Sequence, residues 1–109
     1  MLPPDSAAPV FAALGDPIRL GIVARLGAHG PLSTMSLVAG TRVSRQGIAK
    51  HLRTLESAGI VRGARAGRDR VWELQSARFD EARGFLADIS GQWDQALTRL
   101  QAFVETNEP

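Results

Sequence analysis

The side chains best suited to chemistry lie between residues 42 and 54, where basic and amide groups recur at helical spacing. Arginine can bind the edge of guanine through two hydrogen bonds, and glutamine can bind adenine in the same way. Lysine and arginine also bind phosphate oxygens. The residue types at Arg45, Gln46, Lys50 and Arg53 therefore predict contact with nucleic acid.

A helix over residues 45–58 must position these groups. Three apolar residues follow one another at steps of four and three, which places them on one buried face and leaves the basic and amide groups opposite. They are Ile48, Leu52 and Leu55. Ser44 is placed to cap this helix because its oxygen can accept from N–H groups of the first turn. Gly59 is expected to end it.

The charges are segregated along the chain, although the net charge is only +2. Residues 42–70 carry eight basic and two acidic groups, whereas residues 71–109 carry three basic and seven acidic groups. One surface therefore attracts phosphate and another does not. Arg42 and Arg53 lie in the basic part, where we expect them to hold the DNA backbone.

A short β-hairpin is predicted after this helix. Residues 60–62 and 71–74 have the composition of strands, and the glycine-containing segment between them forms the tip. Three arginines at one tip are more than a solvated turn requires. We therefore expect phosphate or minor-groove contacts, with Arg68 and Arg70 ahead of Arg65.

The first third of the chain is predicted to hold two helices after a loose start. Residues 1–9 are rich in proline and alanine and are expected to be flexible. A short apolar helix then ends at Gly15. Asp16 as a cap and Pro17 at the first helical position start a second helix, which ends in the region 27–30.

A third helix precedes the basic one. Pro31 and Leu32 form an extended link, after which Ser33 caps a helix that ends at Gly40. Together with the basic helix, it gives a helix-turn-helix over residues 33–58. The predicted fold is mainly α with a small β-hairpin (α+β), which is a winged helix-turn-helix.

The last predicted element is one long helix over residues 79–105. Its apolar residues recur at steps of three and four, the spacing of a seam between paired helices. The seam is longer than a small domain can cover, so we expect a second copy to pack on it, although packing on its own domain is an alternative. The predicted dimer interface consists of Val10, Phe11, Leu14, Leu86, Ile89, Trp93, Leu97, Leu100 and Val104.

Length and composition exclude several classes of protein. The 109 residues allow one domain, which we place at residues 10–109. The absence of cysteine excludes disulfides and thiolate chemistry. No run of apolar residues is long enough to span a membrane, so no membrane partner is expected. No signal peptide is seen, and a cytoplasmic location is expected. With no phosphate-binding glycine loop and no base near the serines, we expect neither an enzyme nor a cofactor.

Four segments in order resemble the ArsR-type (arsenic-repressor-like) family of bacterial transcription regulators. They are residues 14–20, 43–55, 58–61 and 67–74. The terminal helix resembles the metal-free branch of that family. The resemblance implies a homodimeric winged-helix repressor. We expect it to bind double-stranded DNA at a palindromic promoter site and to be released by an effector that the sequence does not identify; a small molecule is one candidate. Two major-groove helices about 34 Å apart would read such a site.

The resemblance also assigns roles to single residues. The positions matched to base or phosphate contact are Ser44, Arg45, Gln46 and Lys50. Gly47 stands where a small residue is usual and would let the helix approach the groove closely. His51 matches a position that is usually histidine, and we expect it to pack near the turn and bond to backbone or phosphate.

Metal-sensing members of that family differ from this chain at their ligands. Their thiolate pair would fall in the region 33–37, which has no cysteine, and the helix 79–105 has no histidine. The acids of this helix alone would make a poor zinc or nickel site. These acids include Asp80, Glu81, Asp88 and Asp94. We therefore expect no metal site.

Three alternatives remain at this point. The same surface could bind an acidic protein as a winged-helix interaction module, which salt dependence and sequence preference would distinguish from DNA binding. The terminal acids could form an oxygen-ligand metal sensor. Trp72 and Trp93 could line an effector pocket, although such residues are more often core or interface.

Overall fold

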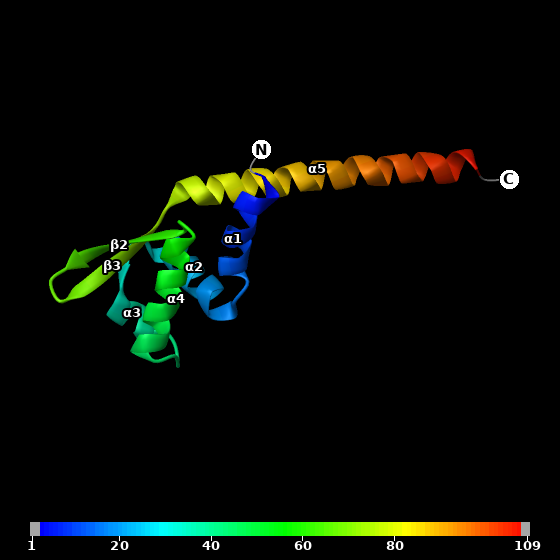
Figure 1. Ribbon diagram of the computed structural model, residues 1–109. Coiled ribbons are helices and arrows are strands. Elements are labelled where there is room, and N and C mark those ends of the chain that lie inside the picture. Colours follow the sequence, from blue (N-terminus) through cyan, green and yellow to red (C-terminus); the bar gives the residue numbers. More distant parts are fainter. Residues whose placement is uncertain (1–2, 108–109) are drawn as a thin grey trace.

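A computed structural model describes residues 3–107 and shows a winged helix-turn-helix with one long terminal helix (Figure 1). Within this part of the chain, five helices and three strands follow one another. They are α1 (Pro4–Leu14), α2 (Pro17–His29), β1 (Leu32–Ser33), α3 (Thr34–Ala39), α4 (Arg45–Ser57), β2 (Val61–Ala66), β3 (Asp69–Leu74) and α5 (Ser76–Thr106). The predicted fold class is confirmed.

The sheet has the strand order β1-β3-β2, and both pairs are antiparallel. β2 and β3 form the predicted hairpin. β1 was expected to be only an extended link, but it pairs with β3, with Leu32 opposite Trp72 and Ser33 opposite Val71. Two residues are too few to show the alternation that marks a strand in a sequence. This pairing joins the wing to the start of the helix-turn-helix.

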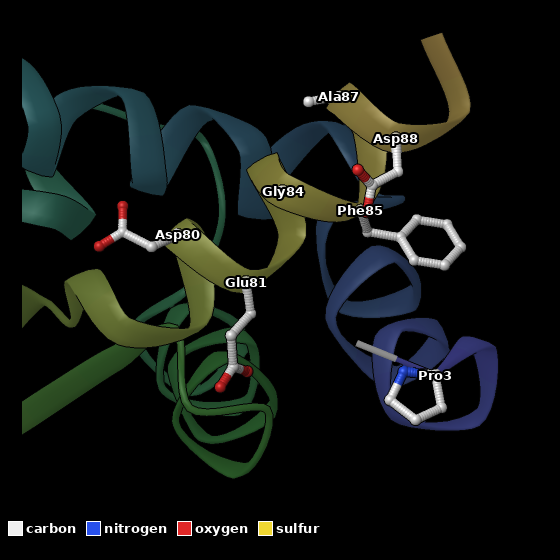
Figure 2. Close-up of a pocket in the computed structure, with 7 residues that line it drawn as sticks. All are labelled: Pro3, Asp80, Glu81, Gly84, Phe85, Ala87 and Asp88. Carbon is white, nitrogen blue, oxygen red and sulfur yellow. The ribbon is translucent and has the colours of Figure 1, made fainter. Parts of the chain in front are cut away.

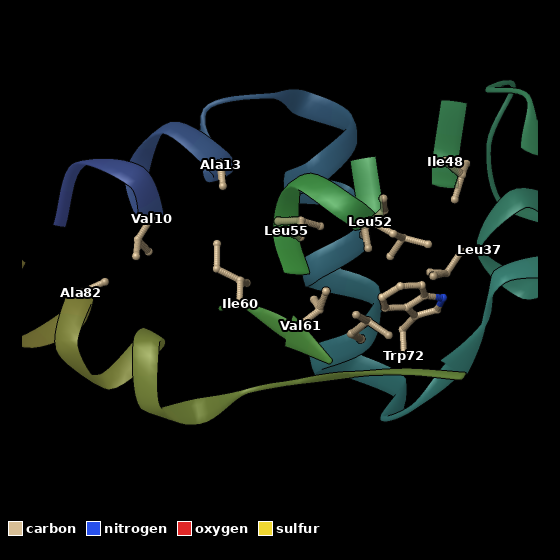
Figure 3. Packing of buried hydrophobic residues seen from close by; sticks show 12 residues of the cluster. Val10, Ala13, Leu37, Ile48, Leu52, Leu55, Ile60, Val61, Trp72 and Ala82 are labelled. Atoms are coloured by element: carbon tan, nitrogen blue, oxygen red, sulfur yellow. The ribbon is translucent and has the colours of Figure 1, made fainter. Parts of the chain in front are cut away.

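The core lies where α1, α2, α3 and α4 meet the sheet (Figure 3). The predicted apolar face of α4 is confirmed, because Ile48, Leu52 and Leu55 are all fully buried. They pack in one cluster with Leu37 of α3 and Trp72 of β3. Each such side chain contributes about 1.5–3 kcal/mol by leaving water. α4 is therefore held firmly, with its other face free.

Two predicted helix caps are present. One oxygen of Asp16 accepts from the backbone N–H groups of Ile18 at 2.8 Å and Arg19 at 3.1 Å. The Arg19 N–H is the main cause that lowers the pKa of the Asp16 carboxyl, while partial burial opposes it. Ser33 Oγ accepts from the N–H of Ser36 at 3.1 Å.

The N-terminal segment differs from its prediction. Residues 1–9 were expected to be loose, but α1 begins at Pro4, and residues 1–2 lie outside the described part. Ala7 and Val10 are buried, because α1 packs against both α2 and α5. Proline is compatible with the first turn of a helix, since its missing N–H would have no partner there.

α5 is longer than the predicted helix and extends well beyond the rest of the molecule (Figure 1). The described residues span 72 Å in the longest direction but only 27 and 22 Å in the others. Ala82 is its one buried residue, and Phe85 packs on Phe11 of α1 with ring centroids 5.9 Å apart. The part of α5 after Phe85, which includes its whole distal half, contacts little of its own chain.

Among the described residues, no single helix has both the length and the apolar composition to cross a membrane. In the described part of the chain, α1 and α2 reach the required length and apolar composition only when they are taken together, and these two helices meet at a bend of 91°.

Candidate nucleic-acid interface

The outward face of α4 carries the side chains that were predicted to read bases. Its inward face is filled by the buried apolar residues, so the basic and amide groups point to solvent. The exposed members of the predicted set are Arg42, Ser44, Arg45, Gln46, Lys50 and Arg53. Ser44 Oγ accepts from the N–H of Gly47 at 3.0 Å, which confirms the predicted cap. Its hydroxyl hydrogen remains free to donate to a phosphate oxygen.

Gly47 has an intramolecular reason to be glycine. A Cβ at this position would lie 2.6 Å from Cγ1 of Val43 and 3.3 Å from Oγ of Ser44. Val43 packs against the core, so it has little room to move. The family resemblance assigned this glycine to close approach of the DNA. In the structure it allows the tight turn that leads into α4.

His51 is half-buried and lies beside an arginine of α2. Nη1 of Arg19 is 3.2 Å from Nδ1 of His51. A guanidinium can only donate, so Nδ1 of His51 is the acceptor in this contact. Arg19 also donates to the carbonyl oxygens of Ala13 at 2.5 Å and Ala12 at 3.3 Å. His51 thus bonds through Nδ1 to a side chain that joins α4 to the end of α1, and its expected bond to phosphate stays a prediction.

The wing has longer strands and a tighter tip than predicted. The strands pair as far as Ala66 opposite Asp69, which leaves Gly67 and Arg68 as a two-residue turn. Gly67 has φ +65°, and a glycine at the first central position is typical of a type II′ hairpin turn. Arg68 is therefore the arginine at the tip, whereas Arg65 lies within a strand.

Arg70 makes contacts within the protein. Arg65 and Arg70 lie directly opposite one another, an arrangement in which like charges repel. The Arg70 guanidinium lies over the Trp72 ring, 4.8 Å from its centroid. Its Nη2 donates to the carbonyl oxygen of Gly63 at 3.2 Å and lies 3.7 Å from Oε2 of Glu56. These contacts engage the Arg70 guanidinium within its own protein, while half of the side-chain surface stays exposed.

A groove of about 220 Å³ separates α4 from the wing. Arg45 and Arg53 line it from α4, and Arg68 and Arg70 line it from the wing. The structure thus gathers arginines from both predicted DNA-binding elements around one concave surface. Four guanidinium groups arranged in this way suit the phosphate backbone of a duplex.

Asp69 is a site residue that the sequence reasoning missed. Its Oδ1 accepts from the N–H of Arg70 at 2.7 Å, and its Oδ2 accepts from the N–H of Met35 at 3.2 Å. The pKa of this carboxyl is lowered chiefly by the hydrogen bond from the Arg70 N–H. The Met35 N–H and the positive charge of Arg45 also lower this pKa, whereas desolvation of the carboxylate raises it. The available signal was an acid inside an arginine run, Gly67 to Arg70.

The two tryptophans lie in different parts of the molecule. Trp72 is buried in the core, and its Nε1 donates to Oγ1 of Thr34 at 2.9 Å. Trp93 lies on the distal half of α5 with 65% of its surface exposed. They do not line a common pocket within one chain. In residues 3–107, no group of three histidine or acidic side chains is placed to hold a metal ion.

Comparison with known proteins agrees with this geometry. Residues 14–64 match a helix-turn-helix domain family. The chain is 35% identical over 103 residues to the HTH-type transcriptional regulator Rv2034 of Mycobacterium tuberculosis, which covers 94% of this chain and 90% of that protein. The solved ArsR-like transcriptional regulator from Rhodococcus sp. RHA1 superposes with a TM-score of 0.76 and 34% identity, covering 91% of this chain and 92% of the other.

A third relative carries a more specific description. The HTH-type transcriptional repressor SmtB of Mycobacterium tuberculosis is 33% identical over 70 residues, which are 64% of this chain and 51% of that protein. These relatives are regulators of transcription, which confirms the expectation that the chain is not an enzyme. The chain belongs to the ArsR family of DNA-binding helix-turn-helix transcriptional regulators.

Proposed function

We propose that this regulator is a homodimeric repressor that reads a palindromic promoter site. The observation that carries the proposal is the exposed basic and amide face of α4 beside the arginine-lined groove of the wing. Gln46 and Arg45 reach base edges in the major groove, with Ser44 and Lys50 at bases and nearby phosphates. Arg68 extends from the wing tip toward the flanking backbone.

Backbone contacts complete the proposed interface. Arg42 lies in the turn before α4 and Arg53 lies near the other end of the exposed face, so both can reach phosphates that border the major groove. Arg65 adds positive charge from within β2. We assign Arg70 a smaller part in DNA binding than Arg68, because Glu56 and Trp72 already hold its guanidinium.

The distal half of α5 supports the dimer. Trp93, Leu97 and Leu100 are 65%, 56% and 58% exposed, and Leu86 and Val104 are exposed on the same seam. Large apolar side chains repeated at this spacing on an isolated helix are typical of a helix–helix interface. The half-buried Ile89, Phe11 and Leu14 can contribute at its edge. Val10 is withdrawn from the interface, since it is only 2% exposed within its own core.

The repressor role and effector release rest on the SmtB relative and on the position of α5. A cleft of about 550 Å³ lies between the start of α1 and α5 (Figure 2). Residues of α5 make most of its lining, including Asp80, Phe85 and Asp88. A small molecule bound there would touch the helix that we propose pairs with its partner, and could change the spacing of the two α4 helices.

Binding of the purified protein to its own upstream DNA tests the proposal. We expect a dimer to bind this duplex more tightly than a scrambled one, with affinity falling steeply between two salt concentrations. Equal and weak binding to both duplexes would contradict sequence-specific readout. That outcome would favour an acidic protein as the partner of the same surface.

A further inference from the structure

Two acids interrupt the basic surface formed by residues 42–70, and both face groups of their own protein. They are Glu56 and Asp69. An acid on a phosphate-binding surface weakens DNA attraction unless it has another role. The contacts of these two carboxylates indicate what that role is.

Asp69 joins the wing to the first helix of the helix-turn-helix. Its carboxylate spans the N–H of Arg70 on β3 and the N–H of Met35 on α3, at 2.7 and 3.2 Å. Met35 is in the first turn of α3, where backbone N–H groups have no partner in the helix. One side chain thus completes hydrogen bonds on both elements.

Glu56 joins the wing to α4. Its Oε2 accepts from the N–H of Gly63 on β2 at 3.4 Å and lies 3.7 Å from Nη2 of Arg70 on β3. Arg70 in turn lies on Trp72. A carboxylate of α4 is therefore connected to both strands of the wing, close to the four-arginine groove.

Trp72 supports the same connection from the core. A Cβ on Gly63 would lie 2.7 Å from the Trp72 ring, so the indole packs directly on the β2 backbone. Its Nε1 donates to Oγ1 of Thr34, which is 3.4 Å from the carbonyl oxygen of Arg70. The hydroxyl of Thr34 thus hydrogen-bonds the start of α3 to two residues of β3.

We propose that Asp69 and Glu56 are positioning residues for DNA binding, which fix the wing against α3 and α4 so that Arg68 and the basic face of α4 meet the duplex together. The inference rests on the proposed DNA contacts of Arg68. Neither acid touches DNA in this account. Each acts through the element that it holds.

Removing an acid changes both the charge of the surface and the position of the wing, and these two changes predict opposite effects on DNA affinity. The inference is therefore testable. Replacing Asp69 by alanine raises the net charge by one, so electrostatics alone would strengthen binding to any duplex. Loss of positioning would weaken binding, because the wing arginine would no longer be held in register with α4. Glu73 offers a matched control, since it lies on the same strand but pairs with Arg62 instead of the helix-turn-helix.

The experiment measures the affinity of the parent, Asp69→Ala and Glu73→Ala for the upstream duplex across a salt series. For Asp69→Ala we expect an affinity loss of about three- to tenfold and a salt slope lower by about one, the change that accompanies one lost phosphate contact. Glu73→Ala should bind at least as tightly as the parent. Asp69→Ala binding as tightly as Glu73→Ala, with an unchanged slope, would overturn the inference.

A second readout needs no DNA and separates this inference from the proposed function. In a Trp93→Phe background, Trp72 is the only tryptophan. Quenching of its fluorescence by acrylamide then reports how tightly the wing packs against α3 and α4. We expect Asp69→Asn, which keeps one acceptor, and Glu56→Gln to increase quenching without loss of helical circular dichroism. Unchanged quenching in both would overturn the inference. A parent that does not distinguish the two duplexes would instead overturn the proposed function.

Discussion

The winged domain buries its large apolar side chains, whereas the distal half of α5 leaves the same kinds of side chain exposed. Leu37, Leu52 and Leu55 are fully buried by their own chain, whereas Leu97 and Leu100 of α5 are more than half exposed. Both regions are helical and follow a spacing of three and four residues. Helical periodicity therefore identifies an apolar face but does not show whether the partner of that face is the same chain or another molecule.

The largest expected difference between the two regions is in stability. Leu52→Ala should lower the free energy of unfolding by about 2–5 kcal/mol, because it opens a cavity in a packed core. Leu97→Ala should change it far less when the protein is dilute enough to be monomeric, since little of its own chain packs on Leu97. Urea denaturation of both variants measures this. Equal losses would show that α5 folds back on its own domain.

A charge on the exposed seam should break association without unfolding the domain. Leu97→Glu places an ion where we propose a second copy packs, so sedimentation velocity should show a monomer with unchanged circular dichroism. Gln95→Glu is the control, because a position two residues from Trp93 points about 200° away around the helix. A parent that sediments as a monomer, or a Leu97→Glu dimer, would remove the basis for the proposed interface.

Within the winged domain, α4 and the wing should fail in different ways. Gln46→Ala should reduce discrimination at one base step by about 1–3 kcal/mol, because a bidentate contact is lost. Arg68→Ala should weaken binding to all sequences alike and lower the salt slope by about one. Competition binding on single-base variants of the site distinguishes the two. Loss of affinity with unchanged preference in both variants would contradict this division.

The smallest expected effect concerns the cap of α2. The pKa of Asp16 is lowered from its ordinary value of 3.8, chiefly by the Arg19 N–H, so the ionised carboxylate stabilises the folded state. This contribution is fully present above the unfolded pKa and is lost as pH falls through the folded pKa. The stability advantage over Asp16→Asn should therefore be constant from pH 7 to 5 and decline below about pH 4. Urea midpoints measured from pH 7 to 2 check this, and an advantage that persists at pH 2 would contradict it.

Local rules predicted the elements that depend on local chemistry. The caps at Asp16, Ser33 and Ser44 and the buried face of α4 follow from short-range hydrogen bonds and spacing, and the structure has all of them. The start of α1 was missed because its helix depends on Ala7 and other residues packing against distant elements. Tertiary contact, and not composition, decides such a segment.

Long-range pairing decided what the sequence left open in the candidate site. The DNA contact of Arg70 stays a prediction, but the sequence did not show that the strand register also places this side chain beside Trp72 and near Glu56, 14 residues earlier in the chain. Asp69 was missed for the same reason, since its partner Met35 lies on another element. No local pattern gives the register of β1 and β2 on β3, and therefore none could reveal these contacts.

Hydroxyl-radical footprinting of the protein on its upstream DNA tests the central claim most directly, because it maps the protected backbone at single-nucleotide resolution. The account predicts two protected clusters related by a dyad, with centres about one helical turn, 34–36 Å, apart, or a multiple of that distance. Each should contain a major-groove segment flanked by a wing contact. A single cluster without a symmetry mate, or uniform weak protection, would contradict a dimer that reads a palindrome.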